Sequence, residues 1–307
     1  MKPPNSPIQL DRLHRAGQKR RILFTVDVED YYMSPESIPI SDWGKPEYPD
    51  RLEVGMNRLL DLLAKYEIQS TFFWVGWLAE RHADLVLRCL EEGHEIGTHT
   101  YDHRPVDSLT REEFRESLGK SCDILSNITG ERVRSHRAPM WSLSRDVDWM
   151  WEELVEAGIE VDSSIYPIES YLFGDSSAPR HPYIIETSSG SLLEVPPGTV
   201  TWLGKRMALG GGGYLRALPY LYLVASLRNW DNERKPEPPE LPETAEYQGE
   251  PVVYIHPWEL DPDHPDLPLE GKEKRVHWIG VKTTHSKLER LFRNSASLSF
   301  RRAFGLL

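Results

Sequence analysis

Two histidines four residues apart and an earlier group of carboxylates could together hold a catalytic metal ion. His99 and His103 form an H-x-x-x-H pair, a spacing that would place both imidazoles on one side of a helical turn. Two histidines and one carboxylate leave positions open for water and substrate. Asp27, Glu29 and Asp30 exceed the needs of one ion, so one could bind it while another accepts a proton from water. The alternative is that both are ordinary histidines on the protein surface. The carboxylates at an earlier strand end favour the metal site over that alternative.

Other ionisable residues follow further predicted strands. Arg137 could hold a catalytic carboxylate ionised and oriented, with a structural salt bridge as the alternative. His256 could protonate a leaving amine, although a lone histidine at a strand end is more often structural. Asp162 ends another strand. Because the carboxyl ends of parallel strands converge on one face of a barrel, we expect these side chains to meet there.

Short apolar strands alternate with amphipathic helices through the first half of the chain. We expect strands at residues 21–26, 70–75, 95–97, 132–135, 159–162 and 251–255. We expect helices at residues 52–66, 78–90, 110–128, 144–157 and 283–293, the third of which begins with a Thr110–Glu113 capping box. This alternation implies a parallel sheet or a barrel.

Glycine and proline become frequent after about residue 165. Residues 210–213 are four glycines, which we expect to form a mobile or substrate-contacting loop because glycine permits close backbone approach. Residues 231–242 are charged and proline-rich, which predicts an exposed loop. We predict a flexible leader at 1–20 and one domain at 21–300. That domain would include a Gly/Pro-rich insertion at about 200–250 and a C-terminal extension from about 257.

Composition excludes several classes of partner. The 307 residues carry a net charge of -12, whereas nucleic-acid and acidic-membrane binders need a positive surface. Residues 1–20 lack the apolar region of a secretion signal, and no stretch approaches the roughly 18–20 apolar residues of a membrane span. We therefore expect a cytoplasmic protein without a membrane span, whose oligomeric state the sequence leaves open.

Taken together, these motifs resemble the polysaccharide deacetylases of carbohydrate esterase family 4, the NodB-homology enzymes. The likeness runs from about residue 21 to about 295. It is carried by residues 25–30 (TVDVED), 98–103 (THTYDH), 137–139 (RAP), 162–164 (DSS) and 254–258 (YIHPW). The D-V-E-D-Y start, the H-P-W-E segment, the glycine run before Tyr214 and the additional C-terminal region are similar to the subgroup associated with bacterial exosortase and exopolysaccharide gene clusters.

The resemblance implies a distorted (β/α) barrel of about seven strands that binds a divalent metal, usually Zn²⁺, with Co²⁺, Mn²⁺ or Ni²⁺ as alternatives. It implies an oxyanion donor in the backbone near Met140 or Trp141, and it places Asp162 near His256 or the groove wall. Trp258 could line the groove or pack in the core. The implied roles are Asp27 as general base, His99 and His103 as metal ligands, His256 as general acid and Arg137 as the buttress of Asp27.

The sequence departs from the commonest family pattern at the second carboxylate. Most members have two adjacent aspartates, the second of which binds the metal. Here the partner of Asp27 is Glu29 or Asp30. Glu29 is favoured if the strand continues, because alternate side chains share a face, whereas Asp30 is equally able if the chain turns after Asp27.

The implied reaction is hydrolysis of N-acetyl groups on the sugars of a bacterial exopolysaccharide, with release of acetate. One alternative is an amidohydrolase that acts on a small cyclic amide or ureide, since similar barrels hydrolyse such compounds. Another is a non-catalytic glycan-binding relative that has lost its metal. Retention of Asp27, His99, His103 and His256 argues against that last alternative.

Overall fold

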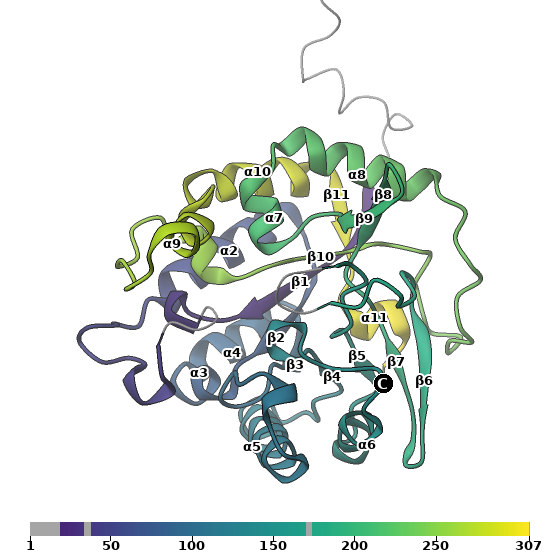
Figure 1. Cartoon of the computed structure of the whole chain (residues 1–307), viewed down its shortest axis with the longest axis horizontal. Coiled ribbons are helices and arrows are strands. Elements are labelled where there is room, and N and C mark those ends of the chain that lie inside the picture. The colour runs from purple at the N-terminus through teal and green to yellow at the C-terminus, as the bar shows by residue number, and fades with distance from the viewer. Residues whose placement is uncertain (1–18, 34–37, 170–173, 307) are drawn as a thin grey trace, which may run out of the picture.

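Seven parallel strands form the centre of the protein in the computed structural model, which describes residues 19–33, 38–169 and 174–306. Neighbours in this sheet follow the order β10-β1-β2-β3-β4-β5-β7 (Figure 1). The strands are β1 (Arg20–Val28), β2 (Ser70–Trp74), β3 (Glu95–Thr98), β4 (Ser135–His136), β5 (Val161–Asp162), β7 (Gly190–Glu194) and β10 (Val252–Ile255). Four further strands lie outside this central set in the described residues. β6 (Tyr183–Thr187) is antiparallel to β7, and β11 (Ser295–Ser297) is parallel to the start of β1. β8 (Thr199–Trp202) and β9 (Lys205–Ala208) form a separate hairpin.

The segment after β7 closes the sheet into a barrel. The backbone N–H of Val195 donates to the carbonyl of Asp162 on β5 (2.8 Å), and that of Gly198 donates to the carbonyl of Val252 on β10 (2.9 Å). Residues 195–198 therefore bridge the two ends of the parallel sheet. The predicted distorted (β/α) barrel of about seven strands is confirmed.

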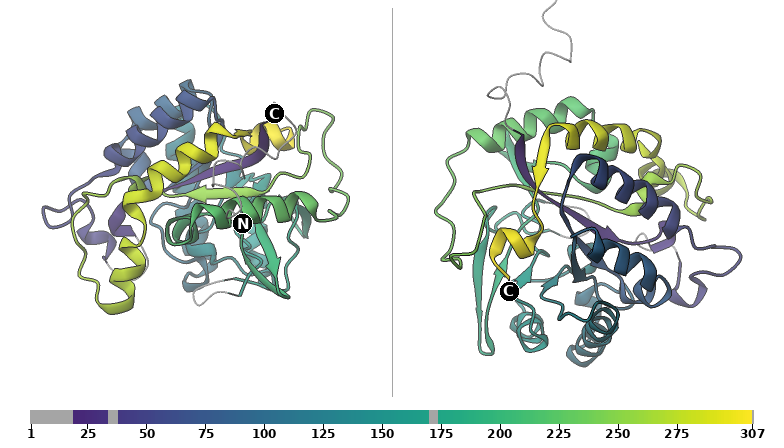
Figure 2. Two further views of the ribbon diagram at one scale, coloured as in Figure 1. Left: turned by 90° about the horizontal axis from the view of Figure 1, so that it is seen from above. Right: turned by 180° about the vertical axis from the view of Figure 1, so that it is seen from behind.

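Side chains along β1 point alternately into the barrel and out toward the surrounding helices. Phe24 and Val26 belong to the core that the strands share with the surrounding helices. Leu23, on the opposite face, packs inside the barrel with Phe300 and Phe304 of α11 (Phe300–Phe304). The right view of Figure 2 shows α11 in yellow, next to β11 (Ser295–Ser297), which pairs with β1. This apolar cluster fills the barrel at the end where the strands begin. The carboxyl ends of the strands carry polar side chains instead.

Helices surround the strands, with α5 and α6 on one side of the barrel and α8 and α10 on the other (Figure 1). The helices are α2 (Leu52–Tyr66), α3 (Gly76–Arg81), α4 (Ala83–Glu91), α5 (Arg111–Thr129), α6 (Asp148–Ala157), α7 (Gly212–Ala217), α8 (Tyr220–Asn232), α9 (Gly271–Trp278) and α10 (Val281–Arg293). Short 3-10 helices lie at Tyr31–Met33, Ile40–Asp42, Val106–Ser108, Pro139–Trp141 and Pro257–Leu260. No helix in the described part of the chain has both the length and the apolar character needed to cross a membrane.

The glycine run is packed rather than exposed. Gly211 bridges Tyr254 of β10 with a φ of 141°, and a Cβ atom there would lie 2.4 Å from the Tyr254 ring. A larger residue cannot be accommodated at this contact, so glycine lets the start of α7 lie directly against β10. The expected loop is therefore a packing contact. Residues 233–250, in contrast, contain no helix or strand, in line with the loop predicted at 231–242.

Candidate active site

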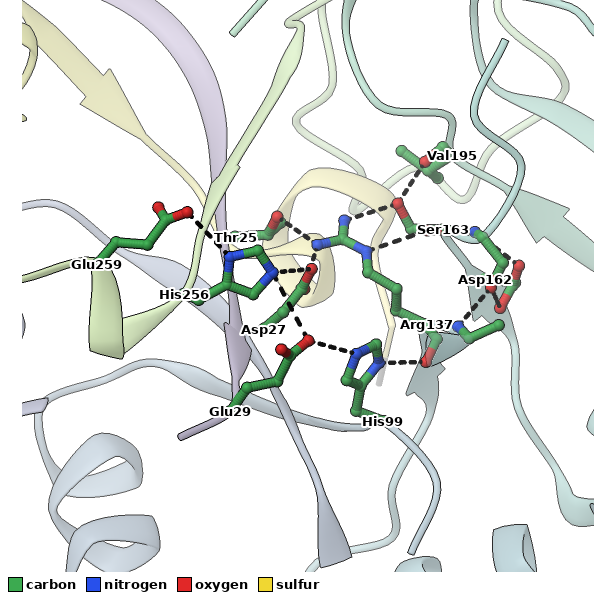
Figure 3. A network of polar contacts seen from close by, with 12 residues as sticks. Thr25, Asp27, Glu29, His99, Arg137, Asp162, Ser163, Val195, His256 and Glu259 are labelled. Carbon is green, nitrogen blue, oxygen red and sulfur yellow. Dashed lines mark hydrogen bonds and ion pairs between the residues drawn. The ribbon is translucent and has the colours of Figure 1, made fainter. Parts of the chain in front are cut away.

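Three side chains that can bind metal meet at the carboxyl ends of β1 and β3. Figure 3 shows two of them, Glu29 and His99. Glu29 Oε1 lies 3.0 Å from His103 Nε2 and 3.3 Å from His99 Nε2, and the three donor atoms lie within 4.8 Å of one another. Ligands of zinc lie about 2.0–2.2 Å from the ion, so donors at these separations can share one ion. All three side chains are buried, and the set fits a divalent cation.

The two histidines converge through a strained loop instead of the predicted helical turn. Residues 99–105 contain no helix, and both Thr100 and His103 have left-handed backbone, with φ of 60° and 54°. The expectation of a helical turn is therefore wrong, although the rings do meet, with centroids 5.1 Å apart. His99 Nδ1 donates to the carbonyl of Arg137 (2.6 Å), since a carbonyl oxygen can only accept. This bond leaves Nε2 free to bind a metal.

The charge states of Glu29 and His99 suit metal binding. Burial alone would raise the pKa of Glu29, but the neighbouring His103 and His256 hold it well below its usual value of 4.5. Burial lowers the pKa of His99. Glu29 is therefore a carboxylate and His99 a neutral imidazole at pH 7, which are the forms that coordinate cations.

Asp30 lies apart from the histidines. Its carboxylate accepts hydrogen bonds from the backbone N–H groups of Tyr31 (2.8 Å) and Arg51 (2.7 Å), and burial raises its pKa to about 7. Of the two carboxylates that the sequence left open, it is Glu29 that the structure groups with His99 and His103.

Arg137 is fully buried and holds Asp27 from one side. Its guanidinium donates to Asp27 Oδ1 (2.6 Å), to Thr25 Oγ1 (2.9 Å), and to the carbonyl and hydroxyl oxygens of Ser163 (3.0 and 2.8 Å). Because Arg137 is held at the same time by β1 and by Ser163 after β5, it fixes the position of the Asp27 carboxylate. The other Asp27 oxygen, Oδ2, lies 3.9 Å from His256 Nε2 (Figure 3).

His256 follows β10 and lies between three carboxylates. Its Nε2 is 3.6 Å from Glu29 Oε1, and its Nδ1 is 3.2 Å from Glu259 Oε1. Burial lowers the pKa of His256, but Glu29, Glu259 and Asp27 together raise it to about 9. A protonated imidazole next to Asp27 can donate a proton to a group bound between them. Glu259 lies in the H-P-W-E segment, and no local sequence pattern predicted its contact with His256.

Asp162 contacts His136 and Glu194, not His256, which corrects one of the positions that the resemblance implied. Asp162 Oδ1 accepts from His136 Nδ1 (2.6 Å), and the strand register aligns Asp162 with both His136 and Glu194. Asp162 also accepts from the backbone and hydroxyl of Ser164 (2.9 and 2.8 Å), and the Ser164 hydroxyl accepts from the N–H of Ala138 (2.8 Å). The buried cluster thus ties the loops after β4 and β5 together.

Replacing Glu194 with Gln should make stability less sensitive to rising pH. Burial, with Asp162 next, raises the pKa of Glu194 well above 4.5, so the neutral form contributes stability at low pH that is lost as pH rises through the folded-state pKa. Gln does not titrate. The unfolding free energy of Glu194→Gln minus that of the wild type, measured in urea, should therefore increase as pH rises above about 4.5.

Glu153→Gln is the matched control for that experiment. Glu153 is also buried, and although burial raises its pKa, Arg115 and Arg111 lower it below 4.5. The charged form of Glu153 therefore stabilises the fold, and the corresponding difference should become more negative as pH rises to about 4.5 and then stay level. Parallel curves for the two variants would contradict the assignment of a proton to Glu194.

The three remaining site residues that the sequence analysis named differ in exposure. Met140 and Trp141 have left-handed backbone, with φ of 54° and 60°, and the N–H of Trp141 donates to the carbonyl of Ala138 (3.2 Å). The Trp141 ring is half-buried against Tyr254, with centroids 4.9 Å apart. Trp258 is 5% exposed and stacks on His277 at 4.6 Å, so it packs in the core instead of lining a groove.

Two family models cover most of the chain. Residues 46–161 match the model described as polysaccharide deacetylase, and residues 163–238 and 240–305 match a domain of unknown function (DUF3473). The chain is 29% identical over 133 residues to the peptidoglycan deacetylase of Helicobacter pylori, covering 41% of this chain and 44% of that protein. It is 32% identical over 97 residues to a peptidoglycan-N-acetylglucosamine deacetylase of Bacillus cereus, covering 31% and 35%. The matches thus span less than half the length of these relatives.

Solved structures support the fold. A Mycobacterium smegmatis structure assigned to the polysaccharide deacetylases aligns with a TM-score of 0.56 at 20% identity, covering 97% of this chain and 90% of that one. One from Pseudomonas aeruginosa PAO1 with the same assignment aligns at 0.54 and 16%, covering 90% and 86%. Both structures are less than 25% identical to this chain, so they support the barrel fold alone. The sequence motifs predicted a likeness to the polysaccharide deacetylases, and the model of that family matches residues 46–161, which contain His99, His103 and Arg137.

Proposed function

We propose that this protein is a metal-dependent hydrolase that removes N-acetyl groups from sugars of a bacterial polysaccharide and releases acetate. The observation that carries the proposal is the donor set of Glu29, His99 and His103, with Asp27 and His256 on its border. A cation site flanked by one carboxylate and one imidazole provides the groups that amide hydrolysis needs.

In this mechanism the chain moves two protons. A divalent ion held by the donor set would polarise the acetyl carbonyl and lower the pKa of the attacking water. Asp27, kept ionised and oriented by Arg137, accepts the proton of that water. The backbone at Met140 donates to the developing oxyanion, since the N–H of Trp141 already donates to Ala138. His256 then protonates the nitrogen of the leaving amine, and acetate departs.

We infer an exopolysaccharide as the polymer, from the likeness of the D-V-E-D-Y start, the H-P-W-E segment and the C-terminal region to exopolysaccharide-associated members. The likeness to a peptidoglycan deacetylase and to a peptidoglycan-N-acetylglucosamine deacetylase favours peptidoglycan as the alternative. Acetate release measured on poly-N-acetylglucosamine, peptidoglycan and short chitin oligomers would separate these polymers. The absence of acetate release from all of them, with release of product from a cyclic ureide, would contradict the proposal.

Removing one histidine should remove both metal and activity. His103→Ala takes away one of three protein donors, so we expect divalent-ion affinity to fall at least about 10–100-fold and acetate release to fall with it. Treatment of the wild type with a chelator should abolish activity, and Zn²⁺ or Co²⁺ should restore it. Metal content by elemental analysis, compared with His285→Ala on exposed α10 surface, is the measurement. Equal metal content in both variants would rule out His103 as a ligand.

A further inference from the structure

We propose that Glu259 and Arg216 are positioning residues for His256, so that the region matching the domain of unknown function completes the active site. The inference rests on the proposed function, because it assigns to these residues the orientation of the imidazole that protonates the leaving amine.

Glu259 joins His256 to a buried cation. It lies in the 3-10 helix Pro257–Leu260, is fully buried, and shares one oxygen between two donors. Oε1 is 3.2 Å from His256 Nδ1 and 2.9 Å from Arg216 Nε. Burial would raise the pKa of Glu259, but Arg216 and His256 hold it below its usual value. Glu259 is therefore a carboxylate, which can only accept, so Nδ1 of His256 carries a hydrogen and Nε2 faces Asp27 and Glu29.

Arg216 is itself held rigidly. It lies in α7, its side chain is 5% exposed, and its guanidinium carbon stands 4.7 Å from the centre of the Trp258 ring. Its Nη1 donates to the last turn of α9 and the residue that caps it, at the carbonyls of Val276 (3.1 Å), His277 (2.5 Å) and Ile279 (3.2 Å). Because these acceptors hold the guanidinium, Arg216 presents Nε to Glu259 in one direction.

Two glycines let the backbone approach closely enough to form this arrangement. Gly280 follows the acceptor turn with a φ of 74°, and a Cβ atom there would lie 2.0 Å from the carbonyl oxygen of Arg216. Gly211 lets the start of α7 lie against Tyr254, two residues before His256. Lys287 of α10 caps the end of α7 by donating to the carbonyls of Leu215, Arg216 and Leu218. The glycine run and α10 thus hold α7 in place, and Arg216 of α7 contacts Glu259 of the H-P-W-E segment.

The expected effect of Glu259→Gln is a loss of orientation at His256. The amide can offer Nδ1 either an oxygen or an NH₂ group, so it no longer fixes which ring nitrogen carries the hydrogen. We expect kcat on an N-acetylated sugar to fall about 10–100-fold, with KM changed by less than about threefold and the metal retained. For an activated aryl acetate, whose leaving group needs no proton, the loss should nearly disappear.

A double-mutant cycle separates this role from a purely structural one. If Glu259 acts through His256, Glu259→Gln should cost nothing further in a His256→Ala background. Arg216→Lys keeps the charge but loses the fork of donors, and should show the same pattern with a smaller loss, which keeps the test usable if Glu259→Gln unfolds. Glu153→Gln removes another buried, arginine-paired carboxylate far along the chain on α6, and should leave the ratio of amide to ester turnover unchanged.

The measurements are kcat and KM on both substrates, metal content and melting temperature. Losses of equal size in the wild-type and His256→Ala backgrounds, or on amide and ester alike, would overturn the positioning role. A wild-type protein that releases no acetate from any N-acetylated sugar would instead overturn the proposed function, so the two failures are distinguishable.

Discussion

Replacing Asp27 with Asn should lower kcat for acetate release about 10³–10⁴-fold while the divalent ion remains bound. An amide cannot accept the proton of the attacking water, whereas its oxygen can still receive the hydrogen bond from Arg137. Asp27 is not part of the cluster formed by Glu29, His99 and His103, so metal affinity should not depend on its charge. Turnover and metal content measured on the same preparation test both parts.

Each departure from that result has a defined meaning. Loss of the ion from Asp27→Asn would make Asp27 a metal ligand, and turnover near the wild-type rate would remove Asp27 from the mechanism. Because Arg137 is fully buried, removal of its counterion is also expected to lower the melting temperature. Thr25→Val is a suitable control, since it removes another acceptor of Arg137 without removing a base.

The local sequence pattern was sufficient to predict most of the helices and strands. The apolar spacing of residues 52–66 predicted α2 with its observed bounds, and the Thr110–Glu113 capping box is present at the start of α5. The helix expected at 78–90 is instead two helices that meet at His82, whose side chain binds Asp50 at 2.7 Å. That contact joins residues 32 positions apart, so no local pattern contains it.

The candidate site was predictable from sequence where a reactive side chain comes directly after a predicted strand. Glu29, His99 and His256 each lie within a few residues of a strand end, and the barrel brings them together. The pairing of Asp162 with His136 and Glu194 depends on the register of three strands, and the contact of Arg216 with Glu259 joins residues 43 positions apart. Such partners are fixed by packing of distant segments, which single-residue patterns do not encode.

Replacing His256 with Ala should lower kcat on an N-acetylated sugar about 10²–10⁴-fold, with a much smaller change in KM and with the metal retained. An amine is expelled slowly as an anion, so the leaving nitrogen must gain a proton as the C–N bond breaks. His256 Nε2 lies 3.9 Å from Asp27 and 3.6 Å from Glu29, close enough to serve a substrate bound at the donor set. Its side chain is 18% exposed, which leaves the imidazole edge open to a ligand.

The leaving group distinguishes this role from others that His256 could have. An aryl acetate with an acidic phenol releases a stable phenolate, so its hydrolysis by His256→Ala should approach the wild-type rate. If His256 instead stabilised the oxyanion or held the attacking water, hydrolysis of both substrates would need the interaction that His256→Ala lacks. Activity on the amide and on the ester would then fall equally. If it held the metal, the ion would be lost from the variant. Only the proton-donor role predicts a defect confined to the amide in a metal-loaded protein.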